Sequence, residues 1–91
     1  MKIYIVEGST GEYSDHCEWA VKAFVSEQKA KDLVTKASEV ANEIFACSEL
    51  DRSDIKYVDR WKATNPFDLG MQMDYNGTRY KYYDIELDEE K

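Results

Sequence analysis

The feature that most constrains the fold is a stretch of apolar residues at helical spacing between residues 27 and 46. Apolar side chains recur there at steps of three and one, the period of a single face of an α-helix. They are Ala30, Leu33, Val34, Ala37, Val40, Ala41, Ile44 and Phe45. Ser26 can cap the first turn, and Glu27 suits the positive end of the helix dipole. A helix of this length, about 30 Å, can cross a small sheet, and its single apolar stripe needs one face of a sheet to cover.

The segments on either side of this helix have the composition of β-strands. Residues 2–6 form a β-branched and aromatic run, and residues 17–25 alternate in polarity. The Gly-, Ser- and Asp-rich residues 7–16 lie between them, which predicts a hairpin with a long loop. Residues 71–75 and 78–87 flank Asn76-Gly77, a pair that accepts the positive φ angles of a type I′ hairpin turn.

The residues between the helix and the second hairpin carry weaker signals. Residues 47–54 are polar, residues 55–62 fit either a short helix or an irregular segment held by Trp61, and residues 63–70 contain the single proline and indicate a loop. The sequence therefore predicts a single α+β domain over residues 1–91. Its expected order is ββαββ, with an antiparallel sheet of about four strands and the long helix packed on one face.

Composition limits the environment and the partners. The chain has 19 acidic and 12 basic residues and a net charge of −7, which disfavours direct binding to nucleic acid or to an anionic membrane. The same charge permits attraction to a basic protein surface, although it would also simply keep a small protein soluble. The two cysteines form no disulfide framework, no apolar run reaches membrane length, and we expect no signal peptide. We expect a cytoplasmic protein.

Groups capable of catalysis or metal binding are few. His16 and Cys17 could form a nucleophilic pair, but neighbouring side chains on a strand point to opposite faces. The contiguous run from Asp15 to Glu18 does not converge as zinc ligands do. The segment Gly8–Gly11 lacks the lysine and the helix that follow a phosphate-binding loop. We therefore expect no enzymatic activity, no metal and no cofactor.

The last predicted strand holds the candidate binding residues. Asp84, Glu86 and Asp88 occupy alternate positions and would form a row of carboxylates about 6.8 Å apart, comparable to the phosphates along a DNA strand. The tyrosines of the same hairpin suit a protein interface. The predicted partner-binding residues are Asp84, Glu86, Asp88, Glu89, Glu90, Tyr80 and Tyr82. The alternatives are a charged edge strand that discourages aggregation and ordinary cross-strand tyrosine packing.

The first third of the chain resembles a pattern in small bacteriophage and prophage proteins. The pattern is a strand, a Gly-x-Tyr-Ser-Asp turn, a second strand that ends in Phe, and a Ser-x-x-Lys-Ala helix start. The matching residues are Gly11, Tyr13, Ser14, Asp15, Phe24, Ser26, Lys29 and Ala30. The last strand matches loosely. The resemblance implies a phage-like origin and carries over no catalytic residue.

These observations lead to two main functional hypotheses. The first is a small, acidic, phage-type binding protein that inhibits a nucleic-acid-handling host machine by protein–protein contact, in the manner of anti-CRISPR or other DNA-mimic inhibitors. The alternative is a structural or assembly protein without catalytic activity, which could form a homodimer through an exposed edge strand. An enzyme that uses Cys17 or His16 ranks third.

Overall fold

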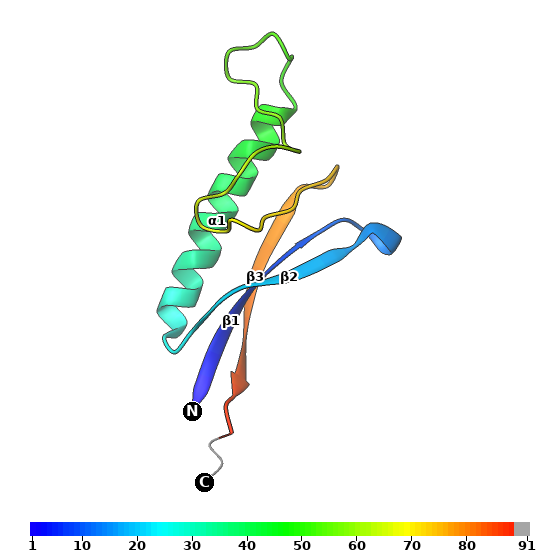
Figure 1. The fold of residues 1–91 in the computed structure, drawn as a ribbon. Helices are drawn as coiled ribbons and strands as arrows, with labels where there is room; N and C mark the ends of the chain where they lie inside the picture. Colours follow the sequence, from blue (N-terminus) through cyan, green and yellow to red (C-terminus); the bar gives the residue numbers. More distant parts are fainter. Residues whose placement is uncertain (89–91) are drawn as a thin grey trace.

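The fold consists of one long helix packed on a three-stranded sheet (Figure 1). The structure is a computed structural model and describes residues 1–88. Its elements are β1 (Lys2–Thr10), a short 3₁₀ helix η1 (Tyr13–Asp15), β2 (Cys17–Phe24), α1 (Glu27–Ser48) and β3 (Thr78–Glu86). The strands form an antiparallel sheet in the order β2-β1-β3, so the first strand is central. The predicted α+β class is confirmed, whereas the four strands and the ββαββ order are wrong.

The helix α1 forms where the apolar stripe predicted it. The Ser26 side chain caps the first turn by accepting a hydrogen bond from the backbone N–H of Lys29 at 3.3 Å. The most deeply buried positions of the stripe are mainly small: Ala30, Ala37, Ala41 and Ile44 are buried. Larger stripe residues such as Leu33 and Val34 are only partly buried. Alanines along the contact line let the helix axis lie close to the sheet, which leaves the larger side chains at the flanks of the contact.

Only one face of the sheet is covered by α1. Val6 is fully buried beneath the helix, and Tyr80 packs against the cluster of Ala41, Ile44 and Met73. Because side chains along a strand alternate between faces, Ile5 and the exposed Ile85 lie on the opposite face. The sheet thus has a helix face and an open face.

Residues 71–75 do not form the predicted fourth strand. The turn before β3 runs from Asp74 to Gly77, whose N–H donates to the Asp74 carbonyl at 3.1 Å. Of the Asn76-Gly77 pair only the glycine has a positive φ, 78°, so the turn is not type I′. Asp74 is instead bonded to Thr10 at the end of β1. The backbone N–H of Asp74 donates to the Thr10 hydroxyl at 3.2 Å, and this hydroxyl donates to the Asp74 carboxylate, also at 3.2 Å. These bonds hold the segment across the end of the sheet, and Met73 enters the core there.

The strand β1 is longer than predicted, because residues 7–10 pair with β2 and β3 instead of forming a loop. Gly8 has a packing role in this extension. A Cβ atom at Gly8 would lie 2.6 Å from a ring carbon of Trp19, its partner on β2, so the indole lies directly over the glycine. Glycine at position 8 therefore lets the large Trp19 ring pack directly on the backbone of β1.

Residues 49–77 contain no helix or regular strand, and they close the core near the end of α1. Val58, Ala63 and Met71 pack against the buried cluster of Ala41, Ile44 and Met73. The irregular alternative for residues 55–62 is thus correct. Trp61 does not hold this segment by burial, because 61% of its surface is exposed.

Candidate protein-interaction surface

The predicted acidic row lies partly in ion pairs with the neighbouring strand. Asp84 and Glu86 are exposed on β3, and each faces a positive group at the start of β1. The Lys2 ammonium lies 3.2 Å from an Asp84 oxygen, and the terminal amino group of Met1 lies 2.9 Å from a Glu86 oxygen. The hydrogen bond that the Lys2 ammonium donates to Asp84 raises the pKa of Lys2. These pairs offset two charges of the row.

The rest of the row lies at the end of the strand. Asp88 is exposed just after β3. Glu89 and Glu90, which the sequence analysis also selected, lie outside the described residues. The part of the row within residues 1–88 is therefore a weaker negative surface than the sequence suggested.

The two selected tyrosines serve the fold. The Tyr80 hydroxyl donates to an Asp68 oxygen at 2.8 Å. Burial of the phenol raises the pKa of Tyr80, and so does this hydrogen bond. Tyr82 packs against Tyr4 on the central strand with ring centroids 6.4 Å apart. The side chains of Tyr80 and Tyr82 thus make interlayer and cross-strand contacts within the fold.

A buried carboxylate, Asp68, connects the long loop with the sheet. One of its oxygens accepts hydrogen bonds from the Trp19 indole N–H and the Tyr80 hydroxyl, both at 2.8 Å, and the other accepts from the N–H of Gly70 at 3.2 Å. Close by, the fully buried Asn65 amide donates to the Ala37 carbonyl on α1 at 3.0 Å. These contacts fix the loop on the helix face. Sequence reasoning missed both residues, since nothing in an Asn-Pro loop signals a buried polar network.

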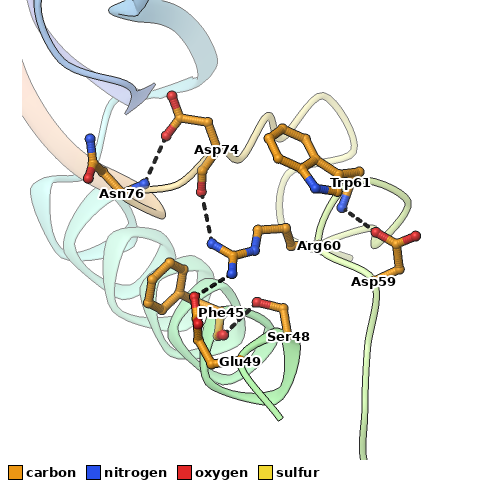
Figure 2. A network of polar contacts seen from close by, with 8 residues as sticks. All are labelled: Phe45, Ser48, Glu49, Asp59, Arg60, Trp61, Asp74 and Asn76. Carbon is orange, nitrogen blue, oxygen red and sulfur yellow. Dashed lines mark hydrogen bonds and ion pairs between the residues drawn. The ribbon is translucent and has the colours of Figure 1, made fainter. Parts of the chain in front are cut away.

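Arg60 anchors the other end of the loop (Figure 2). Its guanidinium carbon lies 4.8 Å from the centre of the Phe45 ring on α1, a cation–π contact. The same group donates to the Asp74 carbonyl at 3.3 Å and forms an ion pair with Glu49. Only 12% of the Arg60 side chain is exposed. Arg60 therefore joins the end of α1, the loop and the turn before β3.

Next to this anchor, two aromatic side chains are held in place but exposed. The backbone N–H of Trp61 donates to the Asp59 carboxylate at 3.0 Å. The indole ring meets the Tyr75 ring edge-on, with the ring centroids 5.7 Å apart and an angle of 79° between the ring planes. Tyr75 is 78% exposed. An edge-on pair is a favourable aromatic geometry. The pair thus presents a large apolar surface to water in a fixed position.

A pocket of about 210 Å³ opens beside Trp61. It is lined by Ser48, Leu50, Arg52, Tyr57, Asp59, Arg60 and Trp61. We call the exposed and half-buried part of this region, together with Tyr75, the Trp61 surface. Its members are Leu50, Arg52, Tyr57, Trp61 and Tyr75. Tryptophan, tyrosine and arginine are the residue types most enriched where binding energy concentrates in protein interfaces. Sequence reasoning selected tyrosines of the hairpin, but it did not identify this surface.

A wider groove runs along the outer edge of β2. It has a volume of about 480 Å³ and lies between residues 19–22 of the strand and residues 66–70 of the loop. Leu69 on its rim is 83% exposed. Since Trp19 and Asp68 in its wall are held by the loop network, this groove depends on the same contacts that fix the fold.

The groups considered for catalysis are not brought together. The two ring nitrogens of His16 face acceptors, a Glu18 oxygen at 2.7 Å and the Gly11 carbonyl at 3.4 Å. Cys17 instead contacts the Gln72 side chain, with its sulfur 3.7 Å from the amide oxygen. Within residues 1–88, no three histidine, cysteine, aspartate or glutamate side chains converge as metal ligands do. The same residues contain no helix with both the length and the apolar character needed to cross a membrane.

Comparison with protein-family models, with curated proteins and with solved structures finds no match for this chain.

Proposed function

We propose that this chain is a non-catalytic protein-binding module whose main anchor is the Trp61 surface. The observation that carries the proposal is the edge-on pair of Trp61 and Tyr75, which is exposed although its backbone and its neighbour Arg60 are fixed by hydrogen bonds. Such preorganisation lowers the entropy cost of binding, because few side chains need to be ordered on contact.

The charge of the chain suggests the class of partner. A net charge of −7 favours approach to a basic surface, and proteins that handle nucleic acids carry such surfaces. We therefore propose an inhibitor or adaptor that occupies the basic face of a nucleic-acid-handling protein, as anti-CRISPR and other DNA-mimic inhibitors do. In this proposal the Trp61 surface supplies most of the affinity, while the summed negative field, Asp88 included, increases the association rate.

A capture experiment followed by affinity measurements tests this proposal. The immobilised chain is used to isolate the partner from cells, and the partner is then titrated against wild type, Trp61→Ala and Leu69→Ala by surface plasmon resonance. Leu69 is a matched control because it is an exposed apolar residue outside the Trp61 surface. Loss of a hot-spot tryptophan should weaken binding by about 30-fold or more.

The salt dependence provides the second half of the test. Association with a basic partner should slow by roughly tenfold as the ionic strength rises from about 0.05 to about 0.5 M, because the attraction is screened. If Trp61→Ala binds as tightly as Leu69→Ala, the Trp61 surface is not the anchor. A rate that does not depend on salt would exclude a basic partner.

A further inference from the structure

We propose that the open face of the sheet is a homodimer interface, in which two copies of this chain pack sheet against sheet. The face combines an apolar half and a polar half. In the apolar half, Ile3 pairs with Ile85 across β1 and β3, Ile5 pairs with Tyr83, and Ile5 also pairs with Ala23 on β2. These residues lie opposite the face that carries Val6 and Tyr80 beneath α1.

The apolar half departs from the pattern of a solvated sheet. An antiparallel sheet with one open face normally alternates apolar side chains toward the core with polar ones toward water. Here isoleucines and a tyrosine from adjacent strands form one contiguous group on the outer side, and Ile85 is 42% exposed. Contiguous apolar groups of this kind mark interaction sites more often than they occur on monomers without a partner.

The charges on this face identify a second copy as the occupant. The polar half carries two acidic residues, Glu7 and Glu18, and two basic residues, Arg79 and Lys81. The Lys81 ammonium lies 3.6 Å from a Glu7 oxygen, so part of this charge is already paired. The open face is therefore neutral on a chain whose net charge is −7. A strongly basic partner gains little attraction there, whereas an identical neutral, apolar face matches it.

The size of the face is adequate for a dimer. β1 and β3 have nine residues each and β2 has eight. Strands rise about 3.4 Å per residue and lie about 4.8 Å apart, so the three strands give a flat area on the order of 420 Å². Projecting side chains raise the accessible area toward the roughly 800 Å² that each partner buries in a standard interface. Two such faces related by a two-fold axis can pack about 10 Å apart, as in β-sandwiches.

Pairing through the β2 edge strand is a less favourable way to form the same dimer. The pairing of β1 with β2 changes register between Val6 and Glu7, so β2 carries a bulge at the edge of the sheet. A bulge interrupts the regular row of backbone groups that another strand would need. Packing through the open face requires no such row.

The test measures the mass of the full chain by light scattering and sedimentation over concentrations from about 1 μM to about 1 mM. The key variant is Ile85→Lys, and its matched control is Ile55→Lys at a loop residue that is 98% exposed. Both changes lower the net negative charge equally, which by itself favours self-association. A lysine in the apolar half should weaken the dimer by about 100-fold or more, because its ammonium loses water without gaining a partner. The control should dimerise at least as well as wild type.

Added salt should strengthen the dimer, whereas it should weaken binding to a basic partner. Two copies that each carry −7 repel one another, so the dimer should become tighter as salt screens the repulsion. Circular dichroism checks that Ile85→Lys is folded; if it is not, Tyr83→Ser on the same face takes its place. A wild type that stays monomeric over the whole range overturns the proposal. Equal dimerisation of the face variant and Ile55→Lys does so too, and would point to an edge or loop contact.

Discussion

The buried carboxylate of Asp68 offers the most direct test of how this fold is held together. Its two oxygens accept three hydrogen bonds, from the Trp19 indole, the Tyr80 hydroxyl and the backbone of Gly70. Asp68 is only 6% exposed, so water cannot easily replace it as an acceptor. Replacing it with alanine leaves the Trp19 and Tyr80 donors without a partner inside the fold, whereas the N–H of the exposed Gly70 can bond to water.

The size of the effect follows from those donors. A buried donor that loses its acceptor costs about 1–3 kcal/mol, and the upper part of this range does not apply to donors on half-buried residues. We therefore expect Asp68→Ala to lower the free energy of unfolding by roughly 3 kcal/mol. For a domain of this size, such a loss lowers the melting temperature by more than about 10 °C.

Asp68→Asn should recover only part of this loss. An amide has one accepting oxygen and one donating nitrogen. Whichever way it is turned, its NH₂ group meets either Gly70 or the pair of Trp19 and Tyr80, all of which are donors. We expect a loss of about 1.5–2.5 kcal/mol, between those of wild type and alanine.

The assay is urea unfolding followed by tryptophan fluorescence and circular dichroism. Asp54→Ala is the matched control, since Asp54 also accepts a backbone hydrogen bond, from Lys56 at 2.8 Å, but is exposed. The control should change stability by no more than about 0.5 kcal/mol. If Asp68→Ala loses less than about 1 kcal/mol, the loop is held by its apolar contacts, and the polar network is not what fixes it.

Two further predictions test contacts of β1 and of the start of β2. Gly8→Ala should lower the free energy of unfolding by about 2 kcal/mol or more in urea titrations, because its methyl group would overlap the Trp19 ring; unchanged stability would mean that the indole lies elsewhere. Both ring nitrogens of His16 face acceptors. The hydrogen bond to Glu18 is the main cause that raises the pKa of His16, and the hydrogen bond to the Gly11 carbonyl adds to it. The stabilisation that protonated His16 contributes to the fold is then complete below about pH 6.5, and it is lost as the pH rises through the raised pKa. NMR titration should show this raised pKa falling toward its ordinary value in Glu18→Gln, and a normal value in wild type would contradict the pair.

The two proposed surfaces can be separated because salt affects them in opposite ways. A contact between an acidic chain and a basic partner weakens as ionic strength rises, whereas a contact between two acidic copies becomes tighter. Trp61→Ala should leave the dimer intact, and Ile85→Lys should leave the Trp61 surface intact. Measuring both variants in both assays therefore distinguishes the failure of one proposal from the failure of the other.

The sequence determined the long helix almost completely, because the signals for a helix are local. The apolar stripe and the Ser26 cap lie within the segment they specify, so no distant residue is needed to read them. The first two strands were also predictable from composition, although the length of β1 was not. Residues 7–10 have turn composition, and they form strand because they pair with β2 on one side and with the distant β3 on the other.

Tertiary structure alone decided the second half of the chain. The Asn-Gly signal predicted a hairpin, but the bonds between Asp74 and Thr10 direct residues 71–75 across the end of the sheet, so these residues do not run alongside β3 as a strand. The candidate site also depends on contacts between distant segments. The row on β3 was visible as a pattern, whereas its ion pairs with the start of β1 come from strands that lie far apart in the sequence. The contact of Arg60 with Phe45 likewise joins segments whose pairing no local pattern indicates. A periodic pattern records which residues share a face, but which face is covered depends on distant segments, and that is a property of packing.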